Sequence, residues 1–189
     1  MKPIILASGS PRRSQILETA GFTFTVIRPD AEEVFDDSMD VMDVPLYLAG
    51  KKMDLALTMA PADAIVITAD TVVILDDTII GKPVDEADAF RILRVLSGTM
   101  HLVVSGVCIH YRGSRYEIDV TTKVFFDHLT DAEIRNYLHT CLPYDKAGAY
   151  AIQEWIGMNK ITRIEGDYYN VVGFPMSKIY PILTALLDM

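Results

Sequence analysis

The chain has 189 residues, of which 50% are hydrophobic and 23% charged; this composition is typical of a folded domain and excludes a disordered chain. The 17 basic and 26 acidic residues give a formal net charge of −9, which disfavours binding to a nucleic acid polymer. No apolar run reaches the roughly 20 residues of a membrane span, and the first one is too short for a signal peptide. We therefore expect one domain over residues 1–189, in the cytoplasm and without a membrane partner.

The opening of the chain predicts a buried strand, a turn of small residues and a helix. The strand covers residues 4–7, and the turn has the sequence SGSPRR at residues 8–13. Ser10 is a favourable N-cap and Pro11 suits the first helical position. The N-terminus of a helix attracts anions, and Arg12 and Arg13 add donors that match phosphate oxygens. The alternative is an ordinary helix start with two solvated arginines.

A second strand is expected over residues 22–28, followed by an acidic segment over residues 29–43. Most of its carboxylates suit a solvated loop, although such a cluster could also supply a metal ligand or a base. A helix is expected from Asp43 to near Pro61. On pattern alone, Lys51 and Lys52 in this helix are surface residues.

Asp70 interrupts the apolar run of residues 64–75. A carboxylate between two buried strand segments is costly unless it is paired or binds a cation. The other interpretation, equally compatible with the sequence, is that Ala69 and Asp70 bend out into a surface turn.

The rest of the chain predicts alternating helices and strands, so we expect a mixed α/β fold. In order they are a hairpin turn at 76–77, a helix over 85–96, strands over 101–110 and 115–126, a capped helix over 131–140, a hairpin of strands over 161–164 and 168–172, and a last helix from Pro175.

Two further segments could carry chemistry. Lys82 lies between Gly81 and Pro83, where a stiff backbone would place its charge, but the surrounding residues do not form a Walker A loop. Gln153 ends the small-residue segment 143–153 and could read the edge of a base. Without other knowledge, a turn and a short strand with Gln153 exposed is the simpler interpretation.

Taken together, eight stretches in order resemble the Maf nucleotide pyrophosphatases, also known as septum-formation inhibitors. They are LASGSPRR (6–13), Glu33, LAGKK (48–52), ADT (69–71), GKP (81–83), LSG (96–98), DKAGAYAIQ (145–153) and NVVGFP (170–175). The resemblance implies a fold similar to the inosine triphosphatases: an elongated central mixed β-sheet flanked by helices, with two lobes and a cleft. It also implies a homodimer.

The activity implied by the resemblance is hydrolysis of dTTP, UTP and modified pyrimidine nucleotides to the monophosphate and pyrophosphate. The sister subfamily, which prefers 7-methyl-GTP, has an acidic residue in place of Gln153. The residues implied are Asp70, Glu33, Lys52 and Lys82 for catalysis; Ser8, Ser10, Arg12, Arg13, Thr71 and Gln153 for substrate binding; and Glu33 and Asp70 for Mg²⁺ or Mn²⁺. A non-catalytic nucleotide-binding regulator of cell division is the alternative, and it would bind nucleotide without releasing pyrophosphate.

Overall fold

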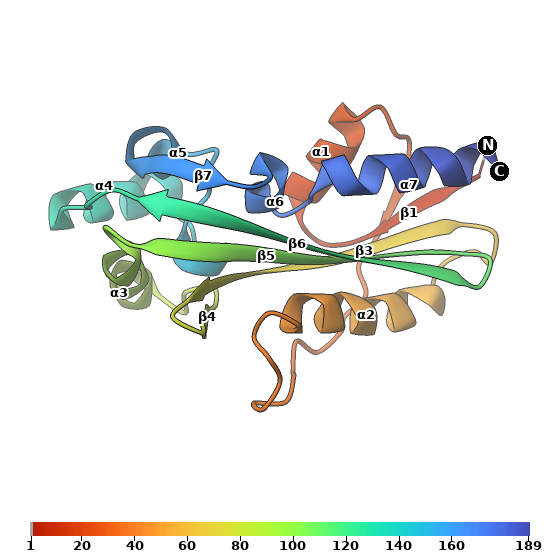
Figure 1. The fold of residues 1–189 in the computed structure, drawn as a ribbon, viewed down its shortest axis with the longest axis horizontal. Coiled ribbons are helices and arrows are strands. Elements are labelled where there is room, and N and C mark those ends of the chain that lie inside the picture. The colour runs from red at the N-terminus through yellow and green to blue at the C-terminus, as the bar shows by residue number, and fades with distance from the viewer. Residues whose placement is uncertain (1) are drawn as a thin grey trace. The chain divides into compact units, whose positions relative to one another are not determined.

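The computed structural model describes residues 2–189 and shows a mixed α/β fold built on one seven-stranded sheet (Figure 1). The strands are β1 (Ile4–Ala7), β2 (Thr25–Ile27), β3 (Ile65–Leu75), β4 (Thr78–Ile80), β5 (Met100–Tyr111), β6 (Ser114–Phe126) and β7 (Ile161–Glu165). The helices are α1 (Pro11–Thr19), α2 (Val44–Leu57), α3 (Glu86–Leu96), α4 (Asp131–Cys141), the 3₁₀ turn η1 (Ala147–Ala149), α5 (Trp155–Lys160), α6 (Tyr168–Val172) and α7 (Met176–Asp188).

The sheet has the strand order β2-β1-β3-β5-β6-β7, with β4 paired to β3. Strand β1 is parallel to both β2 and β3, whereas β4 runs antiparallel to β3 and β7 antiparallel to β6. The predicted fold class, a central mixed sheet with flanking helices, is therefore confirmed.

The chain divides into two compact units. Unit 1 comprises residues 2–70, 105–120 and 173–189, and unit 2 comprises residues 71–104 and 121–172. Strands β3, β5 and β6 have residues in both units. Each unit is described by itself below.

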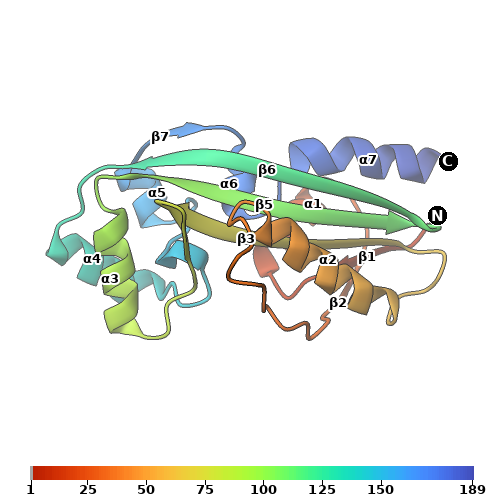
Figure 2. The ribbon, with the colours of Figure 1, turned by 60° about the horizontal axis from the view of Figure 1, so that its bottom comes forward.

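In unit 1, α2 covers one face of the sheet, and α1 and α7 cover the other (Figures 1 and 2). Thr68 on β3 fixes α2 by donating its hydroxyl to the Ala49 carbonyl at 2.8 Å. The helix approaches β5 so closely that a Cβ on Gly106 would lie 2.2 Å from the Leu46 nitrogen. Near the termini, Lys2 Nζ donates to the carbonyl oxygen of Leu186 at 2.7 Å.

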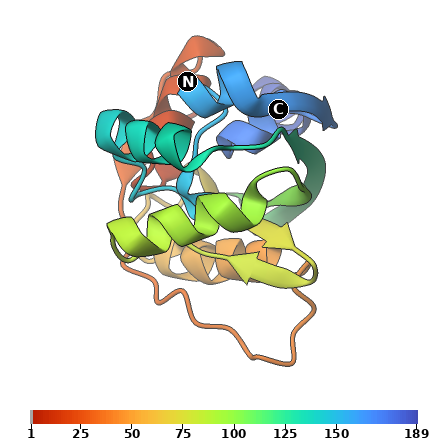
Figure 3. The same cartoon turned by 90° about the vertical axis from the view of Figure 1, so that its left-hand side faces the viewer.

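In unit 2, helices α3 and α4 pack side by side (Figure 3). The core contains His101, which is 1% exposed and packs edge-on against Phe126 and Tyr150. Its Nε2 pairs with the Tyr150 hydroxyl at 2.7 Å, whereas Nδ1 has no hydrogen-bond partner among the described residues. Burial lowers the pKa of His101 to about 4.

The structure decides two expectations from the sequence, the strand over residues 168–172 and the place of Asp70. The expected strand over 168–172 is wrong, because this segment forms the short helix α6. Asp167 Oδ1 accepts from the backbone nitrogens of Tyr169 and Asn170, as an N-terminal cap does. For Asp70, the surface turn is wrong and the buried alternative is confirmed, since residues 65–75 form one continuous strand.

Candidate functional site

The turn after β1 is organised by Ser8, the first residue of the predicted turn. Ser8 is 7% exposed, and its hydroxyl accepts from the Ser10 nitrogen at 3.2 Å. Ser10 occupies the N-cap position of α1 in an extended conformation, but its side chain makes no capping bond to any described residue. Pro11 begins the helix as predicted. The hydroxyl of Ser8 thus shapes the turn that leads into the helix.

Arg13 connects three segments of unit 1. Its Nη1 donates to the Ala69 carbonyl at 2.7 Å and to the Ser8 hydroxyl at 3.2 Å, and its Nε donates to the Gly173 carbonyl at 3.0 Å. Burial lowers the pKa of Arg13, and the nearby charge of Asp70 acts in the opposite sense. The guanidinium remains charged because its ordinary pKa is so high. Hydrogen bonds of Arg13 therefore connect the turn after β1 to Ala69, the residue before Asp70.

Asp70, Lys52 and Glu33 meet in unit 1. Asp70 lies on β3 and is 8% exposed, and Lys52 Nζ on α2 lies 2.5 Å from Asp70 Oδ1. The same ammonium lies 2.8 Å from Glu33 Oε1 in the loop before α2. A buried carboxylate requires such a partner, since desolvation of an unpaired charge is costly. We name Glu33, Lys52 and Asp70 the charged cluster.

Lys51, next to Lys52 on the same helix, holds the loop that carries Glu33. Its Nζ donates to the Val34 carbonyl at 3.0 Å and lies 5.8 Å from the centre of the Tyr47 ring. On pattern alone, Lys51 is expected to be a surface residue. Its contact partner is 17 residues away in the chain and could not be identified from helical spacing.

The charged cluster fits a divalent cation in part. Two carboxylates converge on one ammonium, and Mg²⁺ commonly binds to one or two carboxylates while water and phosphate supply its other ligands. Within residues 2–189, no group of three or more His, Cys, Asp or Glu side chains could hold a metal ion. The charged cluster therefore brings two carboxylates together but forms no larger ligand group.

The predicted residues of unit 2 lie on three different segments. Thr71 is half-buried on β3, Lys82 is exposed between β4 and α3, and Gln153 is exposed in the turn before α5. A backbone bond from Gly148 to the Gly81 carbonyl, 3.1 Å long, connects the GKP turn to η1. The simpler interpretation of Gln153, an exposed residue in a turn, is confirmed, although η1 replaces the expected short strand.

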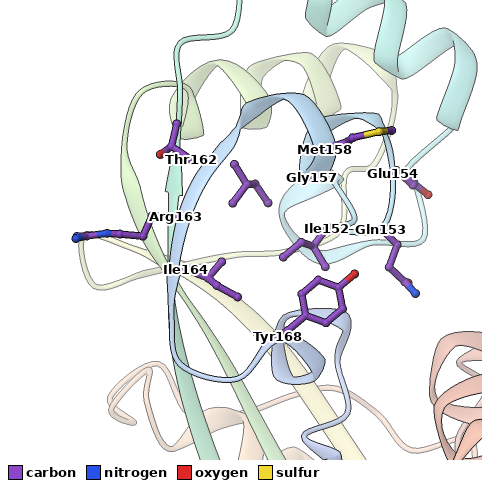
Figure 4. Close-up of a pocket in the computed structure, with 10 residues that line it drawn as sticks. Ile152, Gln153, Glu154, Gly157, Met158, Thr162, Arg163, Ile164 and Tyr168 are labelled. Atoms are coloured by element: carbon purple, nitrogen blue, oxygen red, sulfur yellow. The ribbon is translucent and has the colours of Figure 1, made fainter.

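Gln153 also lines a hollow of about 420 Å³ (Figure 4). The side chains of Ile152, Ile164 and Tyr168 lie around its centre, while Gln153 and Glu154 leave the turn in different directions. The volume falls within the range of small-molecule pockets, which combine an apolar lining with a few polar groups.

Beneath this turn lie polar residues that the sequence did not identify. Lys146 is 8% exposed, and its Nζ contacts Asp145 Oδ1 at 2.8 Å and Glu154 Oε1 at 3.3 Å. The Tyr137 hydroxyl donates to Glu154 Oε2 and accepts from the Ala151 nitrogen. Lys146 lies within the stretch DKAGAYAIQ, but nothing in that pattern points to Tyr137 on the preceding helix.

The comparison with family models gives a match to Maf, described as "Maf-like protein", over residues 3–186. The chain belongs to the Maf family. Among curated Maf relatives, proteins named "dTTP/UTP pyrophosphatase" from Porphyromonas gingivalis, Phocaeicola vulgatus and Bdellovibrio bacteriovorus are 46%, 41% and 44% identical to it. The alignments cover 94%, 97% and 97% of this chain and 90%, 95% and 99% of the relatives.

Among solved structures, this Maf chain is similar to a nucleoside-triphosphatase (dITP/XTP pyrophosphatase) from Mycobacterium abscessus. The TM-score is 0.39 at 17% identity, with 66% of this chain and 72% of the other covered. Within residues 2–189, no helix combines the length and apolar character that crossing a membrane requires.

Proposed function

We propose that this chain is a nucleoside triphosphate pyrophosphatase that hydrolyses dTTP and UTP to the monophosphate and pyrophosphate. The observation that carries the proposal is Asp70, a buried carboxylate that forms an ion pair with Lys52. It is supported by the curated relatives of this chain, which are named "dTTP/UTP pyrophosphatase". A charge buried on a central strand at this cost is typical of a site that performs chemistry.

The reaction requires a water molecule to attack the α-phosphorus. The water oxygen bonds to phosphorus, the bond from phosphorus to the oxygen bridging to the β-phosphate breaks, and pyrophosphate leaves. Asp70 accepts the proton of the attacking water, and Glu33 helps to orient that water. Lys52 keeps the two carboxylates together at 2.5 and 2.8 Å and offsets their charge.

Negative charge that builds on the phosphates needs cationic partners. In unit 1 we assign this role to Lys52 and to the N-terminus of α1, where Ser8 and Ser10 shape the approach. Arg13 contributes its charge, but its hydrogen bonds to Ala69 and Gly173 make it chiefly the residue that holds the turn in place. Lys82 is assigned the same role from the resemblance of its GKP motif to the Maf family.

Recognition of the base is assigned to Gln153, Thr71 and Arg12. An amide presents both a donor and an acceptor, so it can pair with the hydrogen-bonding edge of a pyrimidine. A base with another donor and acceptor pattern would leave polar groups of the amide or of the base unpaired. The exposure of Gln153 in a turn agrees with such a role.

We further propose that Mg²⁺ or Mn²⁺ takes part. Asp70 and Glu33 would hold the cation, with phosphate and water completing its ligands. When bound, it would withdraw charge from the phosphate oxygens. The cytoplasmic location and the homodimer stay predictions.

The test is a panel of nucleoside triphosphates with added Mg²⁺, scored separately for monophosphate, pyrophosphate and orthophosphate. We expect dTTP and UTP to give equal amounts of monophosphate and pyrophosphate. Tight nucleotide binding without product would instead support the non-catalytic regulator, and release of orthophosphate would contradict cleavage at the α-phosphorus.

A second arm tests the base assignment. Gln153→Glu should change the ratio of activity on dTTP to activity on 7-methyl-GTP, because an acidic group replaces an amide that both donates and accepts. Gln15→Glu, an exposed glutamine of α1 changed in the same way, serves as the control for the added charge. An unchanged ratio in the Gln153 variant would remove Gln153 from this role.

A further inference from the structure

The turn over residues 151–154, which carries Gln153, is bonded at both of its ends to one hydroxyl group. Tyr137 lies on α4 with no exposed surface, and its Oη accepts from the Ala151 nitrogen at 3.2 Å. The same hydroxyl donates to Glu154 Oε2. The turn is also closed on itself, because the Glu154 nitrogen donates to the Ala151 carbonyl at 3.1 Å. Residues on either side of Gln153 are thus fixed to the core of unit 2.

The carboxylate in this arrangement has a second partner. Glu154 Oε1 lies 3.3 Å from Lys146 Nζ, which is itself 2.8 Å from Asp145 Oδ1. Because Lys146 is 8% exposed, its ammonium cannot rely on water and needs these carboxylates. Burial, then the hydrogen bond to Glu154 and its charge, raise the pKa of Tyr137, so its hydroxyl remains a donor at neutral pH.

Tyr137 and Lys146 are buried, Glu154 is partly buried, and the three are bonded to one another through Glu154; polar groups bonded in this way tend to hold a single arrangement. Here the network leaves Gln153 outside it: the side chains of Gln153 and Glu154 leave the turn in different directions, and Gln153 is exposed (Figure 4). The backbone of the turn is therefore fixed while the amide stays accessible to a ligand.

We propose that Tyr137, Lys146 and Glu154 are positioning residues that set the direction of the Gln153 amide and so sharpen the choice among nucleobases. This inference rests on the proposed function, because it assigns a use to the turn that presents Gln153. Discrimination by an amide depends on a fixed direction, since a mobile amide can satisfy several donor and acceptor patterns.

Tyr137→Phe tests the proposal by removing only the shared hydroxyl. Tyr150→Phe is the matched control, because it removes another buried hydroxyl of unit 2, the one bonded to His101 at 2.7 Å. We expect both variants to lower the thermal midpoint. Only Tyr137→Phe should lower the ratio of kcat/KM for dTTP to kcat/KM for GTP, by about tenfold.

A purely structural role of Tyr137 would not change the substrate ratio in this way. Two further measurements test whether the effect of Tyr137 passes through Gln153. In a Gln153→Ala background, Tyr137→Phe should leave the ratio unchanged, because the residue through which it acts is gone. Should Tyr137→Phe fail to fold, Glu154→Gln, which keeps the shape but loses the charge for Lys146, should shift the ratio in the same direction.

The proposal is overturned if Tyr137→Phe and Glu154→Gln keep the wild-type ratio, if Tyr150→Phe shifts it equally, or if the shift persists without Gln153. The same ratio is also measured as relative Kd by calorimetry with α,β-methylene analogues of the nucleotides. A wild-type protein that binds these analogues but never releases pyrophosphate would contradict the proposed function, while the Kd ratios would still decide the role of Tyr137.

Discussion

The two units place their polar groups in opposite ways. In unit 1 the charged cluster is directly bonded, with Lys52 between Asp70 and Glu33, so the chain fixes the groups that would react. In unit 2 the buried polar residues lie behind the turn, and the side chain assigned to recognition is exposed. Chemistry needs reacting groups at fixed distances, whereas recognition needs a fixed backbone and an accessible side chain.

If unit 1 fixes the reacting groups themselves, the loss of one charge there should have the largest effect. Asp70→Asn should reduce kcat by about 10²- to 10⁴-fold, the usual contribution of a positioned base. The fold should persist, since the amide oxygen still accepts from Lys52. Pyrophosphate release at saturating nucleotide and Mg²⁺ measures the effect, and circular dichroism checks the fold.

The control is Asp119→Asn, an exposed carboxylate on β6 in the same unit, which should behave like the wild type. Turnover close to the wild-type value in folded, metal-saturated Asp70→Asn protein would take Asp70 out of the role of base.

In unit 2 the buried polar groups support the core, so their loss should appear in stability. Burial lowers the pKa of His101 to about 4, whereas an unfolded histidine titrates near 6.5. Between these values the unfolded chain binds the extra proton, so the free energy of unfolding falls by roughly 3 kcal/mol as the pH drops from about 6.5 to about 4. Below about pH 4 both states are protonated and the loss is complete.

Urea unfolding at pH 7 and pH 4.5 measures this effect in the wild type and in His101→Gln, which cannot titrate. The stability difference between the two proteins should shrink at the lower pH. His128→Gln, at an exposed position, serves as the control for replacing a histidine by glutamine. A difference that is the same at both pH values would contradict the assignment to His101.

Arg13 tests whether unit 1 depends on a planar guanidinium or on charge alone. Lysine keeps the charge but cannot reach the Ala69 and Gly173 carbonyls together, so Arg13→Lys should lower the free energy of unfolding by about 1.5–3 kcal/mol. The measurement is urea unfolding at neutral pH. Arg28→Lys, an exposed arginine after β2, should change stability little, and equal stability of the two variants would show that charge is sufficient.

The smallest effect is expected at Lys51, which holds the loop rather than a reacting group. Lys51→Met removes the bond to Val34 and should reduce kcat by about threefold, in line with the loss of one exposed hydrogen bond. Lys178→Met on α7 is the control. The effect should vanish in a Glu33→Gln background; if it remained, Lys51 would act by another route.

Local sequence patterns predicted the elements that are determined locally. The strand, turn and helix of residues 4–19 and the capping box of Thr130 and Glu133 occur as expected. Tyr168–Val172 was mispredicted because its aromatic and β-branched residues favour a strand, whereas Asp167 caps a helix there. Asn170 then donates from Nδ2 to Val103 and Thr122, more than 45 residues away in the chain.

For the candidate site, too, local sequence patterns indicate the unusual residues but not their distant partners. The motifs indicated Asp70 and Lys52, but the alternatives for Asp70 stayed open because its partner lies 18 residues earlier in the chain. Tyr137 bonds to Glu154 and Ala151, which lie outside its own helix, so the hydrophobic periodicity of the sequence could not predict these contacts. Composition and motifs therefore indicate which residues are unusual, while tertiary packing decides what they contact.

The two compact units differ in when their last residues are synthesised. Every residue of unit 2 precedes Gly173, whereas unit 1 needs residues 173–189, including the Gly173 carbonyl that Arg13 bonds. Arg13 Nε cannot make this bond until Gly173, 160 residues further along the chain, has been synthesised. Part of the hydrogen bonding of the segment translated first therefore comes from the segment translated last.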